Sequence, residues 1–384
     1  MLLSVACIDP VNNNNTLADG SIGGCINLER KQETMKKLLS VLFALTLFTT
    51  FAFAGDKPTA GLVLVGPKSD GGWSMRHYQG MEESGYEFDY VESVSETDSF
   101  RVFNRLARKH DVVFGTSFGY MDPMLQTAKK FPNVKFMHAT GFKTSENMNN
   151  YNCRLFQARY LAGVAAGKLT KTNKIGVVGS HPIPEIISNI NALTLGAQSV
   201  NPDIEVNIIW INSWFDPAKD MSAARALLDW GADVSFTTTD SPSVVVVAEE
   251  KHTAAKPLWG MGNDAPMNSY GPSRYATGPM FNWDVYYSHV MKSVEDGTWK
   301  VDRPFWGMKE GCVGLSPYGP NVPMDVQLLV EDEMAKFVSE EYDASFPFSA
   351  GYTKQDGTVV PAGAGRTEVD SMNHYVKGVI TPMN

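Results

Sequence analysis

One short stretch of this sequence matches a known catalytic pattern. Residues 115–119 read Gly-Thr-Ser-Phe-Gly and fit G-x-S-x-G, in which a serine between a strand and a helix acts as a nucleophile. Aspartates further along the chain and either His289 or His374 would complete a Ser, Asp, His order. However, the sequence has no HGGG-type loop for an oxyanion, and the matching turn in its second half, 236–240, has no such serine. A serine hydrolase that uses Ser117 is therefore the second hypothesis.

Other catalytic or metal-binding patterns are missing from the sequence. The seven histidines show no H-x-x-x-H spacing and the four cysteines no C-x-x-C spacing, which are typical of zinc ligands. There is no Walker A sequence, and no G-x-G-x-x-G follows the first predicted strand. The sequence therefore lacks these two motifs that bind nucleotide phosphates. We predict no catalytic residue, no metal and no cofactor, and hence a protein that is not an enzyme.

Aromatic and acidic side chains gather instead in short segments that follow predicted strands. A flat apolar ligand could lie against such rings while carboxylates and an amide read its edge. Trp73 lies among glycines, which permit a close approach to the backbone, and we expect it to contact ligand. We expect Asp122 and Asp216 to cap helices, whereas Arg76 and His77 could face either the cleft or the surface. The segments are 70–74, 117–122, 213–216, 239–241 and 262–264.

The elements that must position these segments form two similar series. Short β-branched runs alternate with helical stretches, which is typical of a parallel sheet built from βαβ units. The first series has predicted strands 60–66, 87–93, 111–117 and 134–140, with helices 74–84, 98–110 and 122–131. The second has strands 174–179, 205–212, 233–239 and 257–262, with helices 185–200, 217–230 and 243–252.

A repeated series of this length predicts two doubly wound lobes rather than one large sheet. Ligands bind outside the carboxyl ends of such strands, so two facing lobes would form a cleft lined by the strand-to-helix loops. A further helix at 284–296 would return to the first lobe. Connecting stretches at 141–154, 279–287 and 306–320 would then form a hinge with three crossings.

The predicted domain organisation begins outside these lobes. Met35-Lys36-Lys37, an apolar run and Ala52-Phe53-Ala54 have the order of a secretory signal peptide, so we predict a signal at 35–54, cleavage after Ala54 and a periplasmic protein. Residues 1–34 do not belong to the signal and are predicted to be an extension before the true start. The lobes are expected at 58–142 plus about 281–303, and at 143–280 plus about 304–384.

Composition supports a folded, exported chain. The 384 residues are 43% hydrophobic, which is enough for two domains with cores. The net charge of −9, from 42 acids and 33 bases, argues against a nucleic-acid partner, which would require a basic surface. Cys153 and Cys312 remain after the signal, and the sequence leaves open whether they pair.

Several motifs, taken together, resemble one known family. The chain from 58 to 380 is similar to the basic membrane protein family of ABC-transporter solute-binding proteins, which includes purine nucleoside receptors. The resemblance implies a type I periplasmic binding fold of two Rossmann-like lobes. It also implies that the protein is a monomer and delivers its ligand to an ABC permease in the inner membrane. The motifs are Gly72-Trp73, Thr116–Asp122, Phe136–Gly141, Leu195–Pro202, Trp210–Asp216 and Asp296–Trp299.

The resemblance also implies which side chains hold a ligand. Trp73 stands where the family has an aromatic residue after its first strand, and Trp214 or Phe215 where the second lobe supplies the opposing ring. Many nucleoside-binding members carry Phe-Asn at Trp73-Ser74 and a lysine near Asn282, and this chain has neither. We therefore expect a purine, with a free base such as adenine favoured over a nucleoside. A receptor that senses without transport is not separable by sequence. The predicted ligand-binding residues are Trp73, Ser74, Phe118, Tyr120, Trp214, Phe215, Asp240, Asp264, Asn282 and Trp283.

Overall fold

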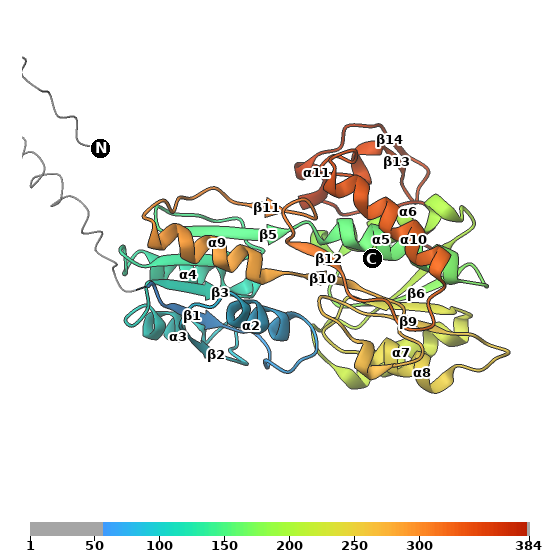
Figure 1. Ribbon diagram of the computed structural model, residues 1–384, viewed down its shortest axis with the longest axis horizontal. Coiled ribbons are helices and arrows are strands. Elements are labelled where there is room, and N and C mark those ends of the chain that lie inside the picture. The colour runs from blue at the N-terminus through green and yellow to red at the C-terminus, as the bar shows by residue number, and fades with distance from the viewer. Residues whose placement is uncertain (1–56, 382–384) are drawn as a thin grey trace, which may run out of the picture. The chain divides into compact units, whose positions relative to one another are not determined.

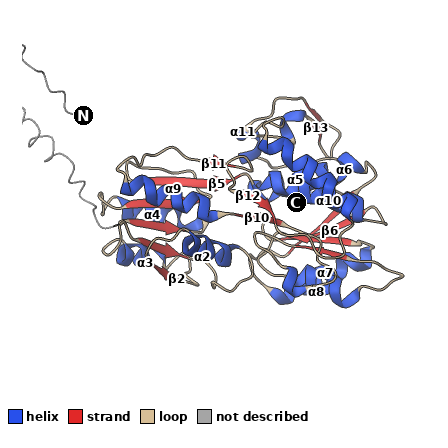
Figure 2. Ribbon diagram, viewed as in Figure 1, coloured by secondary structure: helices blue, strands red, loops and turns tan. Residues whose placement is uncertain are grey.

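A computed structural model describes residues 57–381 of the chain (Figure 1). These described residues belong to one compact unit. The predicted extension at 1–34 and the predicted signal peptide at 35–54 lie outside the described residues. Two parallel sheets with packed helices dominate the described part, as Figure 2 shows.

The first sheet has six parallel strands in the order β11-β5-β4-β3-β1-β2. Its central strands β1 and β3 are buried along their whole length, which explains why they read as continuous apolar runs. The strands are β1 (Ala60–Val63), β2 (Phe88–Val91), β3 (Val112–Gly115), β4 (Lys135–Ala139), β5 (Met148–Cys153) and β11 (Phe305–Trp306). The helices around it are α2 (Trp73–Glu83), α3 (Ser99–Leu106), α4 (Met121–Ala128) and α9 (Trp283–Glu295).

The second sheet has four parallel strands in the order β7-β6-β8-β9. Its strands are β6 (Lys174–Gly179), β7 (Glu205–Trp210), β8 (Val234–Thr237) and β9 (Trp259–Met261). Its helices are α5 (Leu155–Leu169), α6 (Pro184–Val200), α7 (Pro217–Trp230), α8 (Ser243–Lys251) and α10 (Met324–Val338). The remaining elements are the pair β10 (Pro279–Phe281) and β12 (Val313–Leu315), the pair β13 (Tyr352–Thr353) and β14 (Val359–Val360), α11 (Arg366–Asp370) and three short 3-10 turns.

Both predicted series are confirmed, with boundaries that differ by a few residues. The first predicted crossing is corrected, however, because 141–154 contains strand β5, which pairs with β4. The first sheet therefore reaches Cys153 rather than ending at 142, and β11 pairs with β5 beyond the predicted limit of 303. The chain passes between the two sheets after β5, returns between β10 and α9, and passes again between β11 and β12.

Helix α5 was not predicted, and its burial explains why. Every residue of α5 except Lys168 is buried, so the helix has no polar face and no amphipathic period. Glycines permit its close packing against α6. A Cβ on Gly163 would collide with the carbonyl oxygen of Leu193, and one on Gly196 with the carbonyl oxygen of Tyr160.

Cys153 and Cys312 form a disulfide with a Cα–Cα distance of 6.0 Å. Cys153 ends β5 in the first sheet and Cys312 immediately precedes β12. The bond thus ties two of the segments that connect the lobes.

The C-terminal segment covers an edge of the second sheet. The N–H of Val206 in β7 donates to the carbonyl of Gly378, and the N–H of Ile380 donates to the carbonyl of Val206. Trp210 Nε1 also donates to the hydroxyl of Tyr375 at 3.1 Å. This segment therefore protects a strand edge that would otherwise be free to pair.

The close contact of α5 with α6 gives a first prediction. Gly196→Ala should lower the free energy of unfolding by about 1–3 kcal/mol, because the new methyl group forces the helices apart and this outweighs the better helix propensity of alanine. Urea denaturation measures the change. Gly314→Ala in β12 is the control, since the nearest atom to its Cβ position is Asn282 Nδ2 at 3.9 Å, an ordinary contact, and it should not lower stability by more than about 0.5 kcal/mol. A Gly196→Ala protein as stable as the parent would contradict this packing.

Candidate functional site

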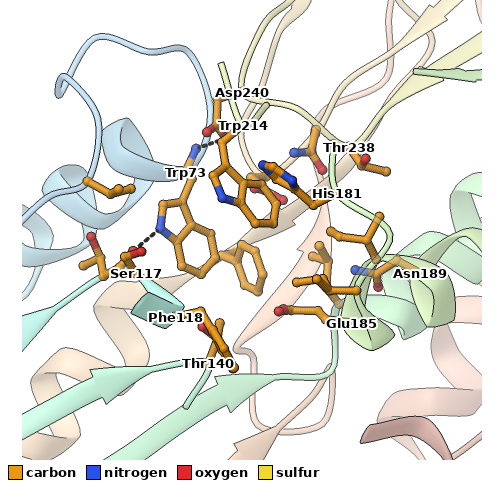
Figure 3. A pocket seen from close by; sticks show the side chains of 18 of the residues that line it. Trp73, Ser117, Phe118, Thr140, His181, Glu185, Asn189, Trp214, Thr238 and Asp240 are labelled. Carbon is orange, nitrogen blue, oxygen red and sulfur yellow. Dashed lines mark hydrogen bonds between the residues drawn. The ribbon is translucent and has the colours of Figure 1, made fainter. Parts of the chain in front are cut away.

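A cavity of about 230 Å³ lies where loops from both sheets meet (Figure 3). Almost all of its wall comes from segments that follow the carboxyl ends of strands, as parallel sheets require. The first lobe contributes Val65, Trp73, Glu96, Thr116, Ser117, Phe118 and Thr140. The second contributes Leu155, Arg159, His181, Ile183, Glu185, Ile186, Asn189, Trp214, Thr238, Asp240, Asn263 and Asp264, and Phe281 of β10 completes the wall.

Trp73 begins α2 and is held in place by its surroundings. Its Nε1 donates to the carbonyl of Thr116 at 2.6 Å. Its ring meets His77, Phe281 and Trp283 edge-on, with centroid distances of 4.3, 5.4 and 5.6 Å. Trp73 therefore offers the cavity a ring of fixed orientation, and it also belongs to the packing of the first lobe.

Trp214 and Phe118 supply aromatic surface from opposite lobes and are less buried. Trp214 is 37% exposed and lies beside His181, with ring centroids 4.8 Å apart. Phe118 is 48% exposed. Both rings line the cavity and are partly accessible, so they are candidates for contact with a ligand.

Asp240 joins the two lobes. Its Oδ1 accepts a hydrogen bond from the backbone N–H of Trp73 at 2.9 Å. Burial, together with the negative charges of Asp70 and Asp264, holds the pKa of the Asp240 carboxyl group well above its usual value. The carboxyl group is therefore protonated over a wider pH range than an exposed aspartate.

Asp264 is buried, and the charge of the buried Arg159 side chain acts on it. Burial raises the pKa of Asp264 to about 7, although the positive charge of Arg159 opposes the shift. Burial lowers the pKa of Arg159 to about 10, so the guanidinium stays charged at neutral pH. It donates to the carbonyl of Thr237 at 3.1 Å and to the side-chain oxygen of Asn263, whose amide in turn donates to the carbonyl of Thr239.

The cavity is acidic. Glu96, Glu185, Asp240 and Asp264 line it, and Arg159 is the one lysine or arginine side chain in its wall among the described residues. Burial also raises the pKa of Glu185. Such a wall suits a ligand that is neutral or rich in N–H donors and disfavours phosphates or other anions.

Five of the ten predicted ligand-binding residues line the cavity: Trp73, Phe118, Trp214, Asp240 and Asp264. Their direct contact with ligand stays a prediction. The other five, Ser74, Tyr120, Phe215, Asn282 and Trp283, do not line this cavity.

In the first lobe, Ser74 and Tyr120 point into the protein. Ser74 is buried, and its Oγ accepts from the N–H of Gly66 at 3.0 Å. Tyr120 is also buried and donates to the carbonyl of Val94 at 2.5 Å. Both side chains stabilise the loops instead of facing the cavity.

Three further predicted residues also lie outside the cavity wall. Phe215 is 43% exposed, although its neighbour Trp214 lines the cavity. Asn282 precedes α9, where it accepts from Arg76 at 3.3 Å and donates to the carbonyl of Gly311 at 2.9 Å. Trp283 is fully buried and stacks on Phe281, with a centroid distance of 4.4 Å. Trp283 therefore supports a cavity residue from behind.

Arg76 and His77, which the sequence left open, are both buried and belong to neither the surface nor the cavity wall. His77 Nδ1 lies 2.5 Å from the hydroxyl of Tyr287, and burial holds its pKa well below the usual value. Arg76 pairs with Glu83 at 3.1 Å and Asp284 at 3.6 Å. Arg76 and His77 therefore hold α2 against α9.

Of the two residues predicted to cap helices, one does so and the other does not. Asp216 precedes α7 and its side chain accepts from the N–H of Lys219 at 3.1 Å, so this prediction is confirmed. Asp122 lies inside the first turn of α4 and pairs with Lys143 at 2.6 Å instead. The cap prediction for Asp122 is wrong.

The structure does not assemble a serine triad around Ser117. Its backbone is extended, with φ −139° and ψ 142°, and its hydroxyl donates to Glu96 at 3.2 Å. The nearby His138 contacts the carbonyl of Ser117 at 2.8 Å rather than its hydroxyl. His289 packs against Trp306 and His374 bonds to Tyr352, so neither completes the site.

Several cavity residues were missed by sequence reasoning. Glu96, His181, Glu185 and Asn189 lie after the ends of β2 and β6, so the rule that selected the other loops could have found them. Arg159 had no such signal, because it lies within the unpredicted helix α5.

Two further features of residues 57–381 concern metals and membranes. Within them, no group of three or more His, Cys, Asp or Glu side chains is arranged to hold a metal ion. Over the same range, no helix combines the length and apolar character needed for a membrane crossing.

Comparison with known proteins identifies the family. Residues 57–344 match the family described as ABC transporter substrate-binding protein PnrA-like, and the chain belongs to this family, also called Bmp. The predicted type I periplasmic binding fold is confirmed, since an ABC-transporter solute-binding protein from Conexibacter woesei matches with a TM-score of 0.62 and 21% identity, over 74% of this chain and 97% of that one.

Two curated relatives are more similar in sequence. A purine-binding protein of Brucella abortus is 42% identical over 339 residues, covering 85% of this chain and 94% of the relative. A putative ABC transporter glucose-binding protein of Haloferax volcanii is 39% identical over 295 residues, covering 75% of this chain and 74% of the relative. The names of these two relatives give different ligand classes, a purine and glucose.

The raised pKa of Asp264 makes stability depend on pH. Between the ordinary value of 3.8 and the folded value of about 7, the folded protein binds more protons than the unfolded chain, so its stability falls as pH rises through this window. Asp264→Asn should make the decline shallower. Urea denaturation of the parent and of Asp264→Asn at pH 4.5, 6 and 8 measures how far the free energy of unfolding falls as the pH rises.

Asp216→Asn is the matched control, because hydrogen bonding to Lys219 lowers the pKa of Asp216 and this variant should lose stability mainly above pH 4. Parallel curves for the parent and Asp264→Asn would contradict the assignment.

Proposed function

We propose that this protein captures a purine between its two lobes, and that a free base is preferred to a nucleoside. The observation that carries the proposal is the combination of flat aromatic walls with buried, proton-holding carboxyl groups in one small cavity. The similarity to the Brucella purine-binding protein supports the same ligand class.

The aromatic residues account for binding of a flat ring. Trp73, Phe118, Trp214 and Phe281 line the cavity, and they come from both lobes and the β10 connection. Stacking of a base on an aromatic side chain contributes about 1–3 kcal/mol. A ring held between lobes would therefore favour the closed arrangement.

The carboxyl groups account for recognition of the ring edge. A protonated carboxyl group presents one hydrogen-bond donor beside one acceptor. The edge of a purine such as adenine offers the complementary pair, a ring nitrogen beside an amino N–H. Asp240 and Asp264 both have raised pKa values and line the cavity, so either can supply this pattern.

The cavity volume favours a compact ligand. About 230 Å³ lies below the range of roughly 300–1,000 Å³ that is usual for drug-sized ligands. A base fits this limit better than a nucleoside, which adds a ribose. The acidic wall further disfavours nucleotides, whose phosphates would meet Glu96 and Glu185.

A hexose is the second candidate, because the Haloferax relative is named as a putative glucose-binding protein. Sugars also lie against aromatic rings and bind carboxylates. The preference for a purine rests on the raised pKa values, since a sugar hydroxyl is well served by ionised carboxylates and needs no proton-holding carboxyl group.

We further propose that the protein works outside the cytoplasm, as a monomer that delivers its ligand to an ABC permease, and that it binds rather than transforms the ligand. Family membership supports this role, and the arrangement around Ser117 does not favour hydrolysis. A receptor that senses without transport remains the alternative. Permease and ATPase genes beside this gene would favour transport.

A thermal-shift panel tests the ligand class. Adenine or guanine at 100 times its Kd should raise the melting temperature by about 5 °C, since such an excess stabilises by about 2.7 kcal/mol. Glucose, ribose and amino acids should leave it unchanged. Stabilisation by glucose or ribose without any effect of purines would reject the proposal.

Trp214 and Phe215 form a matched pair for mutation. Trp214→Ala should weaken adenine binding by about 5- to 150-fold, because it removes one stacking surface worth about 1–3 kcal/mol. Phe215→Ala should change Kd by less than about threefold, since Phe215 does not line the cavity. Isothermal titration calorimetry measures both, and a larger effect of Phe215→Ala would contradict the site. Trp73 is less informative because it also packs in the first lobe.

A further inference from the structure

The first turn of α2 has an unusual set of hydrogen-bond acceptors. A helix leaves its first N–H groups without partners inside the helix. The carboxyl group of Asp70 accepts from the N–H groups of Gly72, Ser74 and Met75, at 2.9, 2.8 and 3.0 Å. All four residues belong to the first lobe, so these bonds do not depend on the position of the second.

The N–H of Trp73 differs because its acceptor lies in the other lobe. It donates to Oδ1 of Asp240, in the loop that follows β8, at 2.9 Å. Figure 3 shows this bond crossing between the two lobes. Among the described residues, no hydrogen bond to the second carboxyl oxygen, Oδ2, is found, and Asp240 lines the cavity.

The backbone around this bond is closely packed. A Cβ on Gly72 would lie 2.8 Å from Oδ1 and 3.0 Å from Cα of Asp240. One on Gly71, whose φ is +91°, would lie 3.5 Å from the carbonyl oxygen of Asp240 and 3.6 Å from the hydroxyl of Tyr270. The absence of a side chain at Gly72 therefore lets the loops of the two lobes touch, while Gly71 is favoured by its positive φ.

We infer that Asp240 is the residue that couples ligand binding to closure of the lobes, with one carboxyl oxygen on the Trp73 N–H and the other available to the ligand. This inference goes beyond the proposed ligand class, because it holds for any ligand that hydrogen-bonds to Oδ2. Asp240 is thus a positioning residue for α2 and Trp73 as well as a contact residue.

Closure of the lobes has a free-energy cost at Asp240, because its carboxyl group loses contact with water. Closure removes the Asp240 carboxyl group from water beside Asp70, Asp264 and Asp220, whose charges act on it in the structure. A polar group that loses water without gaining a partner costs free energy, and the Trp73 N–H replaces water on only one of the two carboxyl oxygens. A ligand bonded to Oδ2 supplies the rest and shifts the equilibrium toward the closed form.

Amide hydrogen exchange observed by NMR tests the bond itself. In Asp240→Ala, the Trp73 amide should exchange at least about tenfold faster than in the parent, which corresponds to a loss of about 1.4 kcal/mol of protection. The Ser74 and Met75 amides should keep their rates, because Asp70 still accepts from them. Equal Trp73 rates in parent and variant, with and without adenine, would overturn the inference.

Small-angle X-ray scattering with adenine tests the coupling. Adenine should reduce the radius of gyration of the parent and of Asp122→Ala, an exposed carboxylate outside the cavity wall. It should not do so for Asp240→Ala or for Gly72→Ala, which keeps the carboxyl group but separates the loops and serves if the first variant fails to fold. Normal compaction of both variants would overturn the coupling. If adenine leaves the parent unchanged, the purine proposal fails, while the exchange rates still decide the role of Asp240.

Discussion

Two carboxyl groups buried where the lobes meet constrain the rest of the structure. Asp240 and Asp264 lie among more acids than bases, and a buried charge without partners is costly. The protein supplies some partners, namely the first turn of α2 for Asp240 and the charge of Arg159 for Asp264. Both carboxyl groups also line the cavity, where a ligand with matching donors and acceptors can bond to them.

The parallel topology explains why these groups share one cavity. Strand-to-helix loops of a parallel sheet all emerge at its carboxyl edge, and the two sheets direct these edges toward one another. The same loops therefore bind the ligand and form the contact between lobes. The disulfide between Cys153 and Cys312 and the β10-β12 pair tie the connecting segments to one another, which is the arrangement expected of a hinge.

The sequence was sufficient for the strands and helices of both series, because short β-branched apolar runs follow one another along the chain with helical stretches between them. It failed for α5, which is buried on all sides and has no amphipathic period. At the site, it identified five of the loops that reach the cavity, missed those after β2 and β6, and did not give the directions of the side chains. Trp214 and Phe215 are neighbours of similar type, and only the three-dimensional course of the loop sends one to the cavity and the other to solvent. Arg159 reaches the cavity through α5 and could not be found without it.

A crystal structure of the protein with adenine would test the central claim most directly. The account predicts the base inside the cavity, with its face against Trp73 or Trp214 and its edge within hydrogen-bonding distance of Asp240 or Asp264. It also predicts that the bond between the Trp73 N–H and Asp240 is present in that complex. A base bound outside this cavity, or a cavity that excludes adenine and holds a sugar instead, would contradict the account.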